Sequence, residues 1–415
     1  MCSTLNGCSS NRDLPTHRRR AVAMYMAVLL IAMLLTGAGI TLISVQRADR
    51  RIQGNIGRGE QAALTAQTGM EWLFWDVNND ADWRTTRVHP DATTLEVSGL
   101  GTLGMKVADP DGDFADDDTD QVQLSVTASH GGSSQTLQAV ATPKTHPALQ
   151  FAVFGNRDVS FESNATVAGP IRSNGDIIAY STVALTDNAA FQTVSGNWIS
   201  SSLEPAGYTD QAMSFPAPDL AFYANQATVV SASGNPRSIS DVNLTDTNNT
   251  LGTANPKGIY WIDAGGYDLE ISWTHVRGTL IITNVYSYVW FAEPCWIEPG
   301  DAGYPTIIVY APGREVWIAM SAGELDEDES SVDFNEDGDT DDTFAPSVGG
   351  VVWTNASDLW LRGSWSLTGC AIGNYVHMYN GIRIDDDPDL QDRLVPGFTD
   401  GKLHLVPGSI REVAP

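Results

Sequence analysis

The pattern of apolar and polar residues divides the chain into an uncharged run, a helical stretch and two kinds of strand-rich sequence. Residues 21–45 carry no charged side chain. At 1.5 Å per residue a helix of that length spans about 37 Å, whereas the hydrocarbon core of a bilayer is about 30 Å thick. The pattern predicts a transmembrane helix at 21–45, preceded by a basic tail at 1–20.

A cleaved signal peptide is the alternative for this run, because Arg18, Arg19 and Arg20 precede it. The run is longer than the apolar region of a signal peptide, which is about 7–15 residues, so an anchor is favoured. Arginines flank both ends, and the positive-inside rule does not decide the orientation. We expect the N-terminus inside, with the acidic remainder of the chain on the other side.

Residues 46–80 keep a helical rhythm after the run. Apolar residues recur three or four positions apart, which is the spacing of one helix face; they are Ile52, Ile56, Ala63, Ala66, Met70, Leu73 and Val77. The pattern predicts one continuous helix that lays an apolar stripe on a soluble domain.

Residues 94–142 then alternate apolar and polar positions between Gly- and Asp-rich turns, which is typical of an antiparallel sheet. Together, 46–145 would form a small α+β unit.

Beyond residue 146 the sequence is a long series of short apolar strands separated by Gly and Asn. Such a series predicts a solenoid of stacked rungs, a right-handed β-helix over 146–415, with a sandwich as the alternative. Residues 200–256 are rich in Ser, Asn, Pro and Ala and are predicted to be a long excursion from it. The expected fold class is therefore mainly β behind an N-terminal helix.

Charge narrows the choice of partners. The chain has 51 acidic and 23 basic side chains, a net charge of −28, yet its first sixty residues are basic. So acidic a body repels nucleic acid, and no nucleic-acid partner is expected. Cys295 and Cys370 lie in this body, and the sequence leaves open whether they form a disulfide or stay as thiols.

The clearest candidate for chemistry is an acidic loop at residues 331–344. Its carboxylates and amide stand at alternate positions around Gly338, in the order of a calcium-binding loop; the predicted ligands are Asp333, Asn335, Asp337, Asp339 and Asp341. Phe344 occupies the twelfth position in place of a bidentate Glu, so another residue would have to complete the shell. The acids just upstream that could do so are Glu324, Asp326, Glu327 and Asp328. A solvated acidic loop is the alternative. The cofactor expected here is a structural Ca²⁺.

Two other acidic runs are weaker candidates. Asp109, Asp111 and Asp113 begin a similar pattern with Gly112 placed too early, and a solvated turn is favoured there. The run Asp385–Asp389 also favours a turn. Tryptophans and tyrosines crowd into residues 260–365, where they would either fill the core or form an exposed strip that stacks on sugars.

The N-terminal region resembles the PilX-like minor-pilin class of type IV pilus assembly. The resemblance covers roughly residues 18–80 and lies in the basic tail, the apolar run, the arginines behind it and the stretch Glu60–Trp72. Two further segments resemble sequences of those members of this class that carry a β-helix; they are Asn164–Ile177 and Val406–Val413. The resemblance implies a helix that packs into a filament or an inner-membrane assembly complex. The Gly–Phe and Glu signature of prepilin peptidase is absent from the run, which leaves processing open.

These patterns, together with what the resemblance implies, lead us to expect a single-pass protein of the inner membrane with its N-terminus in and its body periplasmic or extracellular. Its role would be structural, adhesive or scaffolding, of the pilus- or pseudopilus-assembly type, and not enzymatic. Expected partners are the bilayer, other pilin-like or envelope subunits and surface glycans. The alternative is a tethered carbohydrate-binding protein or polysaccharide-degrading enzyme, which would need carboxylates converging from neighbouring rungs, such as Asp263, Asp268, Glu270 and Glu293.

Overall fold

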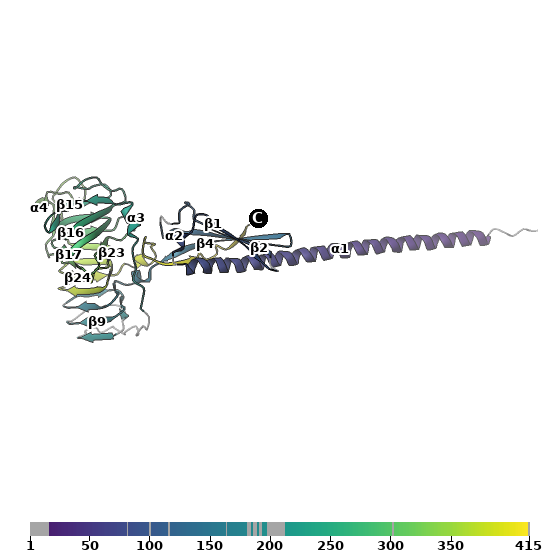
Figure 1. Ribbon diagram of the computed structural model, residues 1–415, viewed down its shortest axis with the longest axis horizontal. Coiled ribbons are helices and arrows are strands. Elements are labelled where there is room, and N and C mark those ends of the chain that lie inside the picture. The colour runs from purple at the N-terminus through teal and green to yellow at the C-terminus, as the bar shows by residue number, and fades with distance from the viewer. Residues whose placement is uncertain are drawn as a thin grey trace, which may run out of the picture.

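The computed structural model describes residues 16–413 apart from 81, 99–100, 115–116, 163, 181–183, 186–188, 191–192, 197–211 and 301–302. The first part of the expected basic tail and residues 200–211 of the expected excursion lie outside the described residues. The chain is mainly β, with one long helix at its N-terminal end (Figure 1).

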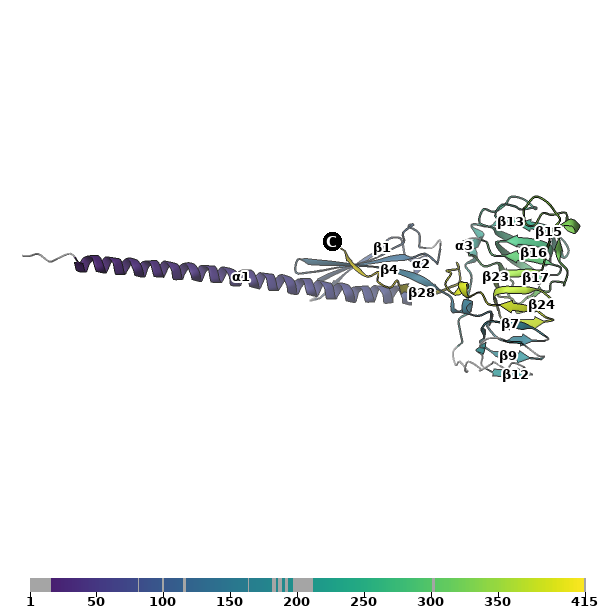
Figure 2. The same ribbon diagram turned by 180° about the vertical axis from the view of Figure 1, so that it is seen from behind.

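Helix α1 (Thr16–Asn79) is a single element of 64 residues, about 96 Å long. Its N-terminal part stands clear of the rest of the molecule (Figures 1 and 2), and its large apolar side chains from Val22 to Val45 are exposed. Among the described residues it is the one helix long and apolar enough to cross a membrane.

The C-terminal part of α1 packs on an antiparallel sheet, as predicted. Strands β1 (Asp91–Val97), β2 (Gly101–Ala108), β3 (Val122–His130) and β4 (Ser133–Thr145) pair in chain order. The helix buries Ala66, Met70, Leu73 and Val77 against that sheet. Gly69 allows the close approach, because a Cβ there would lie 2.6 Å from a methyl carbon of Leu103. We call α1 from Ala62 onward, with this sheet, the helix–sheet unit.

The predicted apolar stripe begins later than expected. Ile52 and Ile56 are more than half exposed, and burial starts at Ala62. The sheet ends before it reaches the first turns after the apolar run, so these two isoleucines lie beyond it.

The last strands return to the helix–sheet unit, which corrects the predicted boundary of 146–415. Strands β28 (Thr399–Leu405) and β29 (Arg411–Val413) both pair antiparallel with β4. They cover an edge of β4 that would otherwise expose unpaired backbone groups. Thr399 pairs with Thr145, and the His146 N–H donates to the Phe398 carbonyl at 2.6 Å. Residues 146–398 are therefore an insertion between two neighbouring strands.

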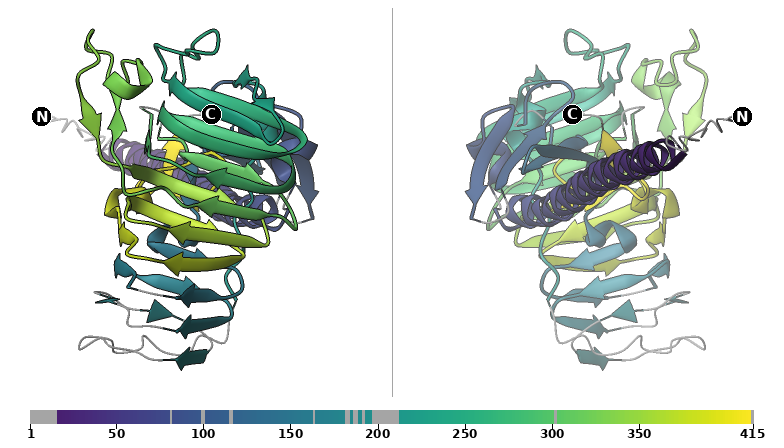
Figure 3. Two further views of the ribbon diagram at one scale, coloured as in Figure 1. Left: turned by 90° about the vertical axis from the view of Figure 1, so that its left-hand side faces the viewer. Right: turned by 90° about the vertical axis from the view of Figure 1, so that its right-hand side faces the viewer.

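The insertion forms a sheet of 21 strands in which almost all pairings are parallel. Figure 3 shows the strands stacked layer on layer, and we call this region the parallel stack. β14 pairs antiparallel with β15. The strands are β5 (Val153–Gly155), β6 (Val159–Phe161), β7 (Thr166–Ala168), β8 (Ile171–Ser173), β9 (Asp176–Ala179), β10 (Ala184–Leu185), β11 (Ala189–Ala190), β12 (Thr193–Gly196), β13 (Thr228–Val230), β14 (Ser233–Gly234), β15 (Arg237–Leu244), β16 (Ile259–Arg277), β17 (Thr279–Phe291), β18 (Cys295–Glu298), β19 (Ile307–Tyr310), β20 (Glu315–Ile318), β23 (Ser347–Thr354), β24 (Asp358–Arg362), β25 (Ser366–Gly373), β26 (Tyr375–Tyr379) and β27 (Arg383–Asp385).

The layers of the parallel stack do not follow chain order throughout. Strands β25, β26 and β27, late in the chain, lie on β5, β6 and β7, which begin the insertion. The chain therefore builds one end of the stack with 153–196, crosses to the other end, and works back until 366–385 meets the first layer. We call this meeting of two segments the seam.

Part of the expected excursion at 200–256 belongs to the stack. Strand β15 pairs with β16 over most of its length, and β13 pairs with β16 as well. Their residues Val230, Ile239, Val242 and Leu244 enter the apolar interior of the stack. These single apolar positions stand among Ser and Asn, and the sequence pattern hid them for that reason. Helix α3 (Leu220–Ala224) covers an outer face of the stack through Tyr223.

Short helices occupy the connections. They are α2 (Trp83–Thr86), α4 (Glu327–Ser330) and the 3₁₀ turns η1 (Pro147–Gln150) and η2 (Pro388–Gln391). Cys295 lies in the interior of the stack, and Cys370 lies in the cluster under α3. Both are free thiols, and burial raises the pKa of Cys295 to about 12. The disulfide left open by the sequence is not formed.

Candidate cation site in the acidic loop

The loop with the predicted calcium ligands is closed by a pair of two-residue strands. Strand β21 (Leu325–Asp326) pairs antiparallel with β22 (Thr343–Phe344), and α4 lies just inside the pair. Asp326 caps α4 by accepting from the Asp328 N–H at 2.9 Å. The loop thus begins and ends at one place, which brings residues 327 and 342 together.

In the structure some of the predicted ligands shape the turn of the loop, whereas Asp339 joins a cluster of carboxylates. Asp333 accepts from the backbone N–H groups of Glu336 at 2.5 Å and Gly338 at 2.9 Å, so its carboxylate shapes the turn. The side-chain amide of Asn335 donates to Asp337 at 3.2 Å. Gly338 has a φ of 101°, the left-handed conformation for which the sequence pattern placed a glycine there.

Three carboxylates converge within the loop. Oxygens of Glu327, Asp339 and Asp342 lie within 4.8 Å of one another. Only Asp339 of the five predicted ligands belongs to this group. Glu327 was named among the upstream acids, whereas Asp342 was missed although it follows a predicted ligand directly. Asp341 is exposed, and its contact with Asp339 raises its pKa.

Glu327 is the fixed member of the three. Its side chain is fully buried and accepts the backbone N–H groups of Phe334 at 2.5 Å, Asn335 at 3.2 Å and Asp342 at 3.3 Å. Three N–H donors hold this carboxylate in one position. Hard oxygen ligands converging from a tight loop are the kind that Ca²⁺ prefers.

Neutral and basic groups dock the loop on the stack. Asn243 donates to the Asp333 carbonyl at 2.9 Å, and the ring of His275 holds Asn243 at 2.9 Å. Glu336 accepts from the hydroxyl of Thr247 at 2.6 Å. Trp296 stacks between His275 and Phe344, with ring centroids at 4.1 and 4.5 Å. The loop is therefore a built part of the surface of the parallel stack.

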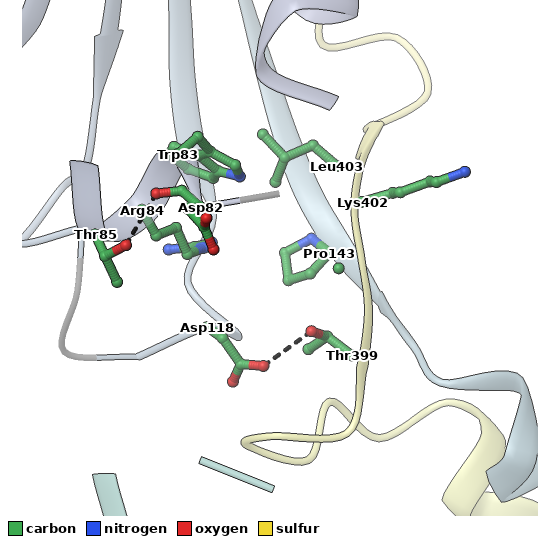
Figure 4. Close-up of a pocket in the computed structure, with 10 residues that line it drawn as sticks. Asp82, Trp83, Arg84, Thr85, Asp118, Pro143, Thr399, Lys402 and Leu403 are labelled. Atoms are coloured by element: carbon green, nitrogen blue, oxygen red, sulfur yellow. Dashed lines mark hydrogen bonds between the residues drawn. The ribbon is translucent and has the colours of Figure 1, made fainter. Parts of the chain in front are cut away.

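The second acidic turn joins the helix–sheet unit to the C-terminal strand. Asp118 accepts from the Thr399 hydroxyl at 2.8 Å (Figure 4) and from the Gly397 N–H at 2.9 Å. Asp118 and Thr399 border a cavity of about 220 Å³ that is also lined by Trp83 and Arg84. The third acidic run, at 385–389, includes a carboxylate, Asp387, that caps η2.

The aromatic side chains divide between the core and the surface. Trp353 and Trp365 are buried. Trp317, Trp360 and His377 instead form a half-buried ladder on successive layers, with ring centroids at 4.7 and 3.9 Å, and Trp290 pairs in register with Trp317. Some tryptophans therefore fill the core, as one alternative expects, whereas others lie at the surface of the stack.

Two of the four carboxylates that a polysaccharide-degrading site would need, Asp263 and Asp268, accept hydrogen bonds in turns. Asp268 accepts the backbone N–H groups of Ser287 and Tyr288, and Asp263 accepts from Gly265 and from the Asn284 side chain. Through these hydrogen bonds the two aspartates stabilise turns of the stack.

One Ser–His–Asp chain also lies in the stack. His377 contacts Ser160 at 2.7 Å and Asp358 at 3.0 Å, but Ser160 is 4% exposed. Because the Ser160 hydroxyl is buried, its contact with His377 joins two neighbouring layers of the stack and does not present a nucleophile.

Comparison with protein-family models finds no match for the chain, and comparison with curated proteins finds none either. Among solved structures, the competence-associated pilin ComZ from Thermus thermophilus is similar at 10% sequence identity and a TM-score of 0.29. The alignment covers 86% of this chain and 98% of that chain. A TM-score this low carries no argument about function, so function is inferred from the residues of this chain.

Proposed function

We propose that this chain is a single-pass cell-envelope protein of the pilus-assembly type that displays the parallel stack outside the cytoplasm for adhesion or scaffolding. The stack is, in this proposal, a right-handed β-helix on a PilX-like, pilin-like base. The N-terminus lies in the cytoplasm, the anchor crosses the inner membrane, and the partners are other pilin-like or envelope subunits.

The observation that carries the proposal is the division of α1 into two halves. Its first half exposes an unbroken apolar surface from Val22 to Val45, while its second half is buried on the sheet from Ala62. Exposed apolar side chains in such number are costly in water and are accommodated in a bilayer or against other apolar helices. One rigid helix would then hold the stack at a set distance from the membrane.

The role we propose is structural or interactive rather than catalytic. Support comes from the acidic side chains of the stack, several of which cap turns, and from the acidic loop, for which we propose a structural Ca²⁺. Surface glycans are proposed partners of the half-buried ladder of Trp317 and Trp360. Tryptophan fluorescence on addition of soluble polysaccharide tests that contact.

Membrane fractionation of the full chain tests the anchor. We expect the wild-type protein in the membrane pellet after a carbonate wash, with the body digested by protease added outside spheroplasts and an N-terminal tag protected. The double variant Leu34→Arg/Leu35→Arg is expected to leave the membrane, because each arginine costs about 3 kcal/mol at the centre of a spanning helix. Ile52→Arg, placed beyond the run, is the matched control and should stay. Recovery of the wild-type chain as a soluble cytosolic protein would overturn the proposal.

A further inference from the structure

A second acidic cluster lies where the helix–sheet unit meets the parallel stack. It belongs to the turn between β2 and β3. Arg84 fixes that turn by donating to the backbone carbonyls of Asp117 at 3.0 Å and Asp120 at 2.8 Å. Asp118 fixes it to Gly397, just before β28, and to Thr399, the first residue of β28. The turn is therefore held from two sides.

Asp109 is buried in this turn without a hydrogen bond. The residue is 4% exposed, and neither carboxylate oxygen has a hydrogen-bond partner among the described residues. The nearest cation is the Arg84 guanidinium, 3.8 Å away, and its N–H groups are bonded to the loop carbonyls. A buried carboxylate left in this state is costly, since desolvation is repaid only by pairing, hydrogen bonds or a metal ion.

Two further carboxylates stand beside Asp109. Oxygens of Asp109, Asp111 and Asp120 lie within 4.8 Å of one another. Ca²⁺ binds oxygen at about 2.3–2.6 Å, so oxygens on opposite sides of one ion lie about 5 Å apart. The three oxygens therefore fit around a single Ca²⁺.

The cluster is open on the side away from Asp109. A cavity of about 520 Å³ borders Asp111, Asp117 and Asp120, and its other wall includes Asp219, Lys257 and Tyr304 of the parallel stack. Asp111 is exposed and Asp120 is half-buried. An ion could enter from this cavity and keep water molecules there, which would complete a shell of six to eight oxygens.

We propose that Asp109, Asp111 and Asp120 bind one Ca²⁺ at the base of the parallel stack, a site separate from the acidic loop at 327–342. The ion adds direct oxygen coordination to the Asp109 carboxylate, which makes one long ion pair with Arg84 and no hydrogen bond among the described residues. By linking Asp109, which follows β2, to Asp120, which lies two residues before β3, it holds the turn that carries Asp118 and so steadies the connection to β28.

Calcium titration of the full chain in detergent, after removal of metal by EDTA and dialysis, tests the site. The probe is CaCl₂, followed by calorimetry and by the thermal unfolding midpoint. We expect Asp109→Asn to lower the stoichiometry by one Ca²⁺ and Asp111→Asn to weaken the same site at least tenfold. Asp113→Asn removes the same charge from an exposed position of the turn and should leave the stoichiometry unchanged.

The variant Asp339→Asn separates this site from the acidic loop. It removes a ligand proposed for the loop and is expected to leave binding at Asp109 intact, so either site can fail without the other. Asp109→Asn keeps the shape of the side chain, and Asp111 is exposed, so at least one of these variants will fold. If both bind as many Ca²⁺ ions as wild type with unchanged affinity, the site does not exist. Equal affinity for Mg²⁺ would overturn the assignment to Ca²⁺.

Discussion

Single residues decide how the two parts of the molecule are connected, and His146 is the clearest case. It follows β4 and is 4% exposed. Its Nδ1 accepts from the Ala148 N–H at 3.1 Å, and its Nε2 contacts the Ser214 hydroxyl at 3.0 Å. An Nδ1 that accepts a hydrogen bond carries no proton, so the folded protein holds this ring neutral. Burial lowers its pKa, which Asp400 only partly opposes.

This arrangement predicts a loss of stability in mild acid. The unfolded chain protonates His146 near pH 6.5, whereas the folded chain resists protonation at that pH. The stabilising contribution is therefore complete above about pH 6.5 and is lost as the pH falls from there through the lowered pKa. We expect urea unfolding of the full chain to show a smaller loss between pH 7.5 and pH 5.5 in His146→Asn, whose side-chain oxygen can still accept from Ala148. His130→Asn is the control for loss of an imidazole, and an unchanged pH dependence in His146→Asn would refute the argument.

At the scale of elements, α1 combines two environments within one helix. The segment between the apolar run and the sheet contains Gly54, Gly57 and Gly59, with Ile52 and Ile56 exposed beside them. Each glycine costs a helix interior about 1 kcal/mol relative to alanine, so this segment is the least stable part of α1 by intrinsic preference. Apolar packing on the sheet supports the helix from Ala62 onward.

The difference between the two environments can be measured with one matched pair of variants. Leu73 is 3% exposed on the sheet, and Ile52 is 55% exposed. Leu73→Ala is expected to lower the free energy of unfolding of the helix–sheet unit by about 2–5 kcal/mol, the usual cost of such a cavity. Ile52→Ala should change it by less than about 0.5 kcal/mol. Chemical denaturation in detergent gives both values, and equal effects would mean that the helix is not docked as described.

At the scale of the whole molecule, the seam holds together two segments that are distant in the sequence. Asparagines stack across it: Asn374 donates to the Ala356 carbonyl at 2.8 Å on one side and accepts from Asn156 at 3.0 Å on the other. Asn174 continues the row with a bond to Asn156 at 3.3 Å. Backbone pairing of β25 with β5 and of β26 with β6 runs beside it.

Loss of Asn374 should therefore weaken the contact between the segments. Asn374→Ala leaves the Asn156 side chain and the Ala356 carbonyl without their partner, at a cost of about 1–3 kcal/mol. We expect limited proteolysis to cleave residues 153–196 faster in this variant than in wild type. Asn225→Ala, at the exposed end of α3, is the control. Cleavage at the wild-type rate would show that backbone pairing alone holds the seam.

Much of the candidate site could be read from residue spacing, and part of it could not. The alternate acids around Gly338 indicated the loop in which three carboxylates converge, and the glycine that its turn requires. Which acids converge depended on the closure of β21 on β22, which brings Glu327 to Asp342 across the loop. At Asp109 the sequence favoured a solvated turn, because spacing reports neither burial nor the absence of a donor.

The sequence by itself determined the elements whose signal is local. An uncharged run of 25 residues, a helical rhythm to Val77 and strict alternation in 94–142 each repeat with the period of one element, and each element formed. Only the tertiary structure decided that 399–413 complete the first sheet, that 366–385 close on 153–168, and that Asp109 is buried. The physical reason is that strand pairing and burial are contacts between distant residues. Periodicity along the chain does not indicate which distant residues are in contact.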